Sequence, residues 1–233
     1  SVIQIENEYY STIRPKRICP SGERPINVLS TEGIDYLELR CVDLNPYCAI
    51  GITEDQINFL DTLLIYCFVT ESPEVGLEES SRIQRNHQKV VNEGRDEGAL
   101  LETKEGSIPL REEASKLLFE LEKVADFMDR EVLKSKNGSW LKSISAQTHN
   151  IANQDGTLSG QVIDDLENNN LSFRGLGNKM SNLHQEKMIS KKSNLDQLFL
   201  DACKKSIKDT KNIESKNQKD FEDYLKDFLD KIS

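Results

Sequence analysis

A glutamate and an arginine two positions apart, Glu38 and Arg40, are the residues of this sequence whose types and spacing best suit chemistry. They lie in residues 34–42, a run that alternates as a β-strand does, so both project from one face. A carboxylate suits Mg²⁺, and a guanidinium suits the charge that develops on a transferring phosphoryl group. The opposite face of the run is expected to belong to the core and carries Leu37, Leu39 and Cys41.

A second alternating run, residues 2–10, ends at Tyr10, which shares a face with Glu8. Alternation alone leaves two interpretations of these strands open. The first is a half-exposed sheet with a surface ion pair, as many antiparallel sheets have, and the pattern by itself favours it. The other is a catalytic sheet that holds a metal and an anionic substrate. The basic run 13–17, between the strands, suits an anion site and a solvated loop equally well.

The pattern changes near residue 52 and predicts two parts. Residues 1–51 have the pattern of strands and turns, with a helical turn expected at 25–30, whereas residues 52–233 are expected to be mainly helical. Thr53 and Gln56 have the spacing of a capping box at the start of the first long helix. Further helices are expected at 80–92, 111–133, 140–152, 195–209 and 221–232.

Composition argues against several classes of protein. Asp and Glu number 40 against 30 Lys and Arg, a net charge of -10, so the chain should repel the phosphates of a nucleic acid. It has no apolar run of about 20 residues, so no membrane span is expected. Its five cysteines form no zinc or disulfide pattern, which predicts reduced thiols and a cytoplasmic protein. Its first residue is Ser1 rather than methionine, which predicts the downstream part of a longer protein.

Four blocks of sequence, taken in their order and spacing, resemble a known family. The blocks cover residues 5–10, 13–17, 33–40 and 43–46, and together they resemble glutamate–cysteine ligase of the proteobacterial type, also called γ-glutamylcysteine synthetase. The likeness is strong over residues 1–51, weaker at 91–95 and thin beyond about residue 135. The blocks are those of the C-terminal portion of the family.

The resemblance implies an α+β fold, with part of a glutamine-synthetase-like antiparallel catalytic sheet followed by a mainly helical region. It implies a ligase that uses ATP and Mg²⁺ to join the γ-carboxyl of L-glutamate to the amine of L-cysteine through a γ-glutamyl phosphate, the first step of glutathione biosynthesis. Family members are longer, so the missing N-terminal half is an expected partner and this chain alone is expected to be inactive. The alternative is a non-catalytic helical interaction protein derived from such a gene.

By the same resemblance, three residues are expected to have roles in the reaction. Glu38 matches a glutamate that binds Mg²⁺, and Arg40 matches an arginine that faces the ATP phosphates and the acyl-phosphate transition state. Tyr10 matches a tyrosine near the carboxylate of the cysteine substrate. Neighbours of this site are expected to be Glu8, Arg14 and Arg17.

Overall fold

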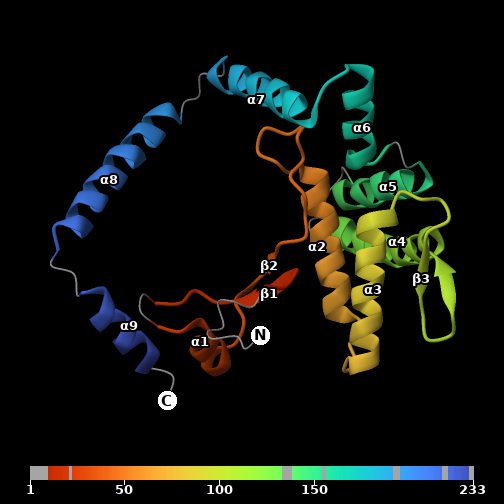
Figure 1. The fold of residues 1–233 in the computed structure, drawn as a ribbon, viewed down its shortest axis with the longest axis horizontal. Coiled ribbons are helices and arrows are strands. Elements are labelled where there is room, and N and C mark those ends of the chain that lie inside the picture. The colour runs from red at the N-terminus through yellow and green to blue at the C-terminus, as the bar shows by residue number, and fades with distance from the viewer. Residues whose placement is uncertain are drawn as a thin grey trace. The chain divides into compact units, whose positions relative to one another are not determined.

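The protein has an α+β fold that is mainly helical, with two small antiparallel sheets among the residues that the structure describes (Figure 1). The structure is a computed structural model and describes residues 10–20, 23–132, 138–153, 156–190, 195–216 and 220–230. Contacts divide the chain into two compact units: a first unit formed by residues up to 43 and from 189 onward, and a second unit formed by residues 44–188. Within the described ranges, no helix combines the length and apolarity needed to cross a membrane.

The first unit contains a two-stranded antiparallel sheet, in which Ile13 pairs with Leu39 and Lys16 pairs with Tyr36. The alternation expected at residues 34–42 is present, but it covers a shorter strand. The expected strand at 2–10 lies outside the described residues, apart from Tyr10. The elements of this unit are β1 (Ile13–Lys16), α1 (Pro25–Glu32), β2 (Tyr36–Leu39), α8 (Asp196–Glu214) and α9 (Phe221–Asp230).

The apolar face of this sheet differs from expectation. Leu37 is 44% exposed and Ile13 is 45% exposed, and Cys41 is also exposed, while Leu39 is half-buried. The prediction that Leu37, Leu39 and Cys41 belong to the core is therefore wrong for the described residues. Alternation identifies which side chains share a face, but a face becomes a core when another layer covers it.

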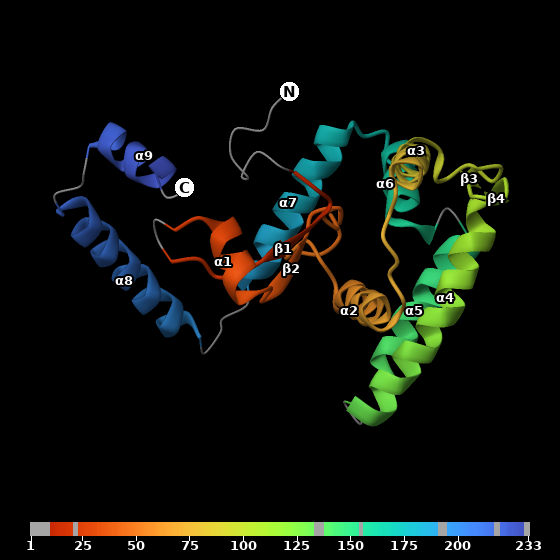
Figure 2. The ribbon, with the colours of Figure 1, turned by 90° about the horizontal axis from the view of Figure 1, so that it is seen from below.

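The second unit is built on a helical core in which α2, α4 and α5 pack together. Figure 2 shows α4 and α5 running side by side along their length. The elements of this unit are α2 (Glu54–Val69), α3 (Leu77–Glu93), β3 (Leu100–Glu102), β4 (Ser107–Pro109), α4 (Leu110–Phe127), a π-helical turn (Met128–Val132), α5 (Ser139–Ala152), α6 (Leu158–Asn168) and α7 (Phe173–Ser190). Its buried centre consists of Leu118, Leu121, Ala125 and Ile144, with Trp140 and Phe59 among the residues packed around it.

The capping box predicted at the start of α2 is confirmed. The Thr53 hydroxyl accepts a hydrogen bond from the Gln56 backbone N–H at 3.3 Å, and the Gln56 side-chain oxygen accepts one from the Thr53 backbone N–H at 2.9 Å. Two backbone donors that the helix leaves without intrahelical partners are thereby satisfied. The start of α2 is therefore encoded locally.

The helix expected at 111–133 gives way at Met128 to the π-helical turn, which contains the buried carboxylate of Asp129. This carboxylate accepts the backbone N–H groups of Leu141 at 2.9 Å and of Trp140 at 3.4 Å. Gly138, the N-cap of α5, has no side chain that could accept these bonds. Asp129 thus caps α5 from a different element, which a search for local capping motifs does not find.

We expect Asp129→Ala to lower the free energy of unfolding by about 1–3 kcal/mol, because it leaves two partly buried backbone donors of α5 without an acceptor. The measurement is denaturant unfolding of the whole chain. Asp126→Ala is the matched control, since Asp126 pairs with Arg130 at the exposed surface one turn earlier. The control should change the stability by less than about 0.5 kcal/mol, and an equal loss for both variants would contradict a capping role.

Candidate functional site

Glu38 and Arg40 contact each other on the polar face of the sheet in the first unit. Arg40 Nη2 lies 3.0 Å from Glu38 Oε2, and Lys16 Nζ on the paired strand lies 3.5 Å from the same oxygen. The backbone N–H of Arg40 donates to the Thr12 carbonyl at 2.8 Å, which extends the strand pairing to this residue. The predicted shared face of Glu38 and Arg40 is confirmed, and all three charged side chains remain partly exposed.

Tyr10 lies beside this pair. The Arg40 guanidinium carbon is 5.3 Å from the centre of the Tyr10 ring, within the range of a cation–π contact. Tyr10 is 77% exposed, so one side of its ring and its hydroxyl are accessible. The structure therefore brings together Tyr10, Glu38 and Arg40, the three residues that the sequence singled out. We refer to these residues with Lys16 as the strand cluster.

The charges of the strand cluster favour an ionised Glu38. Desolvation raises the pKa of this carboxyl, but the hydrogen bond and charge of Arg40, together with Lys16, outweigh that effect. The net result is a pKa below the ordinary value of 4.5. A carboxylate that is charged at neutral pH meets the first requirement for a metal ligand.

The other predicted neighbours differ in their surroundings. Arg14 is the register partner of Glu38 on β1 and is half-buried. Arg17 instead contacts Glu32 at 2.9 Å and Asp35 at 3.0 Å, so it ties the end of α1 to the start of β2. Glu8 lies outside the described residues. Within the ranges that the structure describes, no group of three or more His, Cys, Asp or Glu side chains is arranged to hold a metal.

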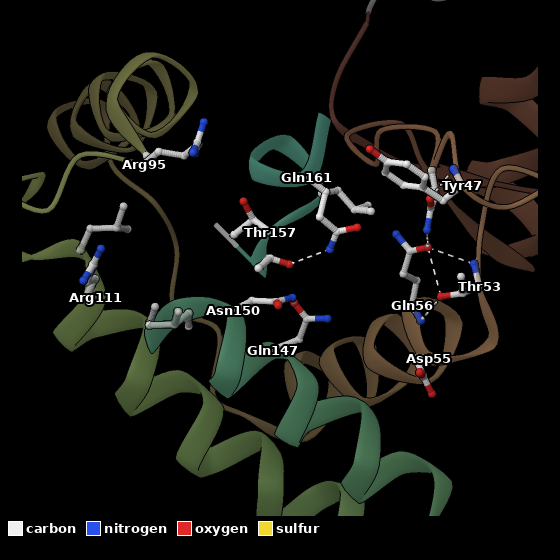
Figure 3. Close-up of a pocket in the computed structure, with 17 residues that line it drawn as sticks. Tyr47, Thr53, Asp55, Gln56, Arg95, Arg111, Gln147, Asn150, Thr157 and Gln161 are labelled. Carbon is white, nitrogen blue, oxygen red and sulfur yellow. Dashed lines mark hydrogen bonds between the residues drawn. The ribbon is translucent and has the colours of Figure 1, made fainter. Parts of the chain in front are cut away.

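A second feature, a cavity of about 610 Å³, lies in the second unit and was not predicted from the sequence. Figure 3 shows Arg95 and Arg111 on one side of it and Tyr47 with Gln56 on the other. Its lining comes from segments between residues 45 and 161, so no short motif describes it. The sequence block at residues 91–95 indicated one part of this cavity, because Arg95 belongs to that block and also to the lining.

Comparison with known proteins finds that the chain is similar to glutamate–cysteine ligases. A family model described as glutamate–cysteine ligase matches residues 1–90. A glutamate–cysteine ligase of Saccharophagus degradans is 34% identical over 231 residues, which cover 98% of this chain and 43% of that protein. One from Pseudomonas syringae is 37% identical over 186 residues, 80% of this chain and 34% of that protein.

The chain is a homologue of the glutamate–cysteine ligases. It matches the C-terminal portion of these ligases and spans less than half the length of the curated relatives it matches. The resemblance found in the sequence blocks is confirmed, and it extends further along the chain than those blocks do.

Solved structures agree with this assignment at the level of fold. The glutamate–cysteine ligase of Francisella tularensis, solved in complex with AMP, superimposes with a TM-score of 0.84 at 24% identity. The match covers 98% of this chain and 45% of that ligase chain. A bifunctional glutathione synthetase from Pasteurella multocida gives a TM-score of 0.55 at 20% identity, over 78% of this chain and 22% of that chain.

The ligase homologue also carries a long-range tie near the cavity, between the loop 44–51 and helices α6 and α7. The Tyr47 hydroxyl donates to Asp165 Oδ2 at 2.8 Å, and His184 Nε2 lies 2.7 Å from the Pro46 carbonyl oxygen. Burial raises the pKa of Tyr47, and the hydrogen bond and charge of Asp165 with the charge of Asp164 raise it further, to about 12.

We expect Tyr47→Phe to lower the free energy of unfolding by about 1 kcal/mol at neutral pH, because it removes a hydrogen bond to a carboxylate at a partly exposed site. The pKa of Tyr47 is raised above its ordinary value of 10.0, so this stabilisation is present below pH 10 and is lost as the pH rises through about 12. Denaturant unfolding at pH 7, 10 and 12 measures it. Wild-type and variant proteins should converge toward the highest pH, and a constant difference would contradict the titration of Tyr47.

Proposed function

We propose that the strand cluster is part of the active site of an ATP-dependent ligase that joins the γ-carboxyl of L-glutamate to the amine of L-cysteine. The support is the homology to glutamate–cysteine ligases together with the Glu38–Arg40 contact at 3.0 Å beside Tyr10. The whole reaction needs more charged groups than this cluster contains. The chain therefore contributes one wall of the site, and the region that the relatives have in addition contributes the others.

The reaction has two steps, and Arg40 acts in the first. The γ-carboxylate of glutamate attacks the terminal phosphorus of ATP, which forms an acyl phosphate and releases ADP. In this proposal the guanidinium of Arg40 hydrogen-bonds the oxygens of the transferring phosphoryl group and offsets their charge. The amine of cysteine then attacks the acyl carbon, loses a proton and displaces inorganic phosphate.

Glu38 fits a ligand of Mg²⁺. Its carboxylate is ionised and partly exposed, and its Oε2 faces Arg40 and Lys16. Mg²⁺ usually takes one or two protein carboxylates, with phosphate oxygens and waters as the other ligands. One glutamate from this chain is therefore enough as a protein ligand. When bound, Mg²⁺ supplies charge neutralisation for the phosphates of ATP.

Tyr10 fits a substrate-binding role. Its hydroxyl is accessible, and a phenol can donate a hydrogen bond to a carboxylate such as that of cysteine. Its ring contacts the Arg40 guanidinium, so Tyr10 also holds that side chain in place.

We place the reaction in the cytoplasm because the described cysteines are free thiols.

A chimaera tests the proposal. This chain replaces the matching portion of the Saccharophagus degradans ligase, and phosphate release is measured with ATP, Mg²⁺, L-glutamate and L-cysteine. We expect turnover that requires all four components in the chimaera and none in this chain alone, because one wall of a site cannot preorganise the reacting charges. A well-folded chimaera without turnover would contradict the proposal and would favour a non-catalytic interaction protein.

A further inference from the structure

The cavity of the second unit has the electrostatics of an anion site. The first turns of α2, α4 and α6 contribute residues to its lining, among them Gln56, Arg111 and Leu158. The N-terminal end of a helix carries a partial positive charge and backbone N–H groups that point outward along its axis. Acceptors within the protein already take the Gln56 N–H, the Gly160 N–H and the Leu110 N–H, so these ends contribute their dipoles rather than free donors.

Two guanidinium groups strengthen this potential. Arg95 follows the end of α3 and lines the cavity, and Figure 3 shows its side chain extending from the helix end toward the cavity. Arg111 is the second residue of α4, so it brings a cation to the positive end of that helix, where a cation is unfavourable without an anion nearby. A bound anion would relieve this unfavourable placement.

The acidic residues near Arg111 do not provide that anion. Glu97 approaches Arg111 Nη2 to 3.7 Å, but its side chain is 84% exposed, so this ion pair is weak and easily displaced. Glu112 and Glu113, in the first turn of α4, contact Lys116 instead, at 2.9 and 3.8 Å. Asp55 belongs to the lining, and Figure 3 shows its carboxylate directed away from the labelled amides.

The rest of the lining is neutral and combines polar side chains with an apolar part formed by Leu110, Ala114, Ile151 and Leu158. Gln161 donates from Nε2 to the Gly156 carbonyl at 3.0 Å, which fixes the side chain and directs the amide within the cavity wall. Gln147 and Asn150 project from α5 beside it (Figure 3). Carboxamides both donate and accept hydrogen bonds, which suits the hydroxyl groups of a sugar. The volume of about 610 Å³ is that of a typical small-molecule site.

We propose that this cavity binds a phosphate group carried by a hydroxyl-rich small molecule such as a sugar phosphate. The two arginines take the phosphate, and the carboxamides take the hydroxyl groups. The proposal does not depend on the ligase reaction, because the cavity lies wholly within the second unit whereas the strand cluster lies in the first.

Calorimetric titration of the whole chain tests this inference, with inorganic phosphate, ribose 5-phosphate and L-glutamate as probes in chloride buffer of constant ionic strength. We expect ribose 5-phosphate to bind more tightly than inorganic phosphate, and both to bind more tightly than L-glutamate. Arg111→Gln should weaken the binding of both phosphates by about tenfold or more, because a charge-assisted contact is lost. Arg130→Gln, an exposed charge at the far end of the same helical segment, should leave it within about twofold.

Two further variants keep the test decisive. Arg111→Lys retains the charge and should lose less affinity than Arg111→Gln, so it serves if the glutamine variant does not fold. Arg40→Gln removes one of the two cations of the strand cluster and should not change binding of ribose 5-phosphate to the cavity. The inference is overturned if Arg111→Gln binds the phosphates as the parent does, if Arg40→Gln alone weakens them, or if L-glutamate binds most tightly.

Discussion

Replacing Arg40 by alanine is expected to lower the turnover of the chimaeric ligase by about 100-fold or more, because one charge-stabilising group at a reacting centre typically contributes that much. The guanidinium of Arg40 is held by Glu38 at 3.0 Å and by the ring of Tyr10, so it is positioned before substrate binds. Phosphate release at saturating ATP, glutamate and cysteine measures the loss. Glu38→Gln is expected to have an effect of similar size and to raise the Mg²⁺ concentration that half-saturates the enzyme.

Arg85→Ala is the matched control for the loss of an arginine–glutamate pair. Arg85 contacts Glu102 at 2.7 Å on the exposed surface of the second unit, so its removal changes the same type of interaction away from the strand cluster. Its turnover should stay within about twofold of the parent. Near-normal turnover of both Arg40→Ala and Glu38→Gln would contradict the proposed roles of these two residues, and the homology to the ligases would not by itself restore them.

Leu121→Ala is expected to destabilise the second unit by about 2–5 kcal/mol, because it removes a fully buried side chain and leaves a cavity between α2, α4 and α5. Leu121 has no exposed surface and belongs to the central cluster with Leu118 and Ile144. Denaturant unfolding followed by circular dichroism measures the loss. A loss of this size is a large fraction of the stability of an ordinary domain.

Leu117→Ala provides the comparison on the same helix. Leu117 is also an apolar residue of α4, but it is 38% exposed. Its replacement should cost about 1 kcal/mol or less. Equal losses at both positions would show that the packing of α4 differs from the structure described above.

Helices whose signals are local were predictable from the sequence. The capping box of Thr53 and Gln56 places the start of α2, and apolar spacing places α3, α4, α5, α8 and α9. The hairpin β3–β4 interrupts the region predicted to be mainly helical. It is held to α3 by hydrogen bonds between Asn86 and the backbone of Glu102, at 2.8 and 2.9 Å. Contacts between elements override local preference in such short strands, and no alternation over three residues reveals them.

The site was predictable in part for the same reason. Strand alternation correctly places Glu38 and Arg40 on one face, because that relation depends on residues two apart. The exposure of Leu37 was not predictable, since it depends on which layer covers the sheet. The cavity with Arg95 and Arg111 depends on how four helices and the loops beside them pack together, and local sequence patterns do not reveal such packing.

The loop 44–51 is expected to gain its two long-range contacts late during synthesis of the chain. Its ties run from Tyr47 to Asp165 and from Pro46 to His184, over 118 and 138 residues of sequence. Contacts of such range form after local helices, because closing a long loop of chain costs entropy. A ribosome-bound chain that has not yet released α7 would already contain the α2, α4 and α5 core but would lack the contact of this loop with His184. Protease protection of the loop in stalled chains of increasing length should therefore appear abruptly once His184 has left the exit tunnel.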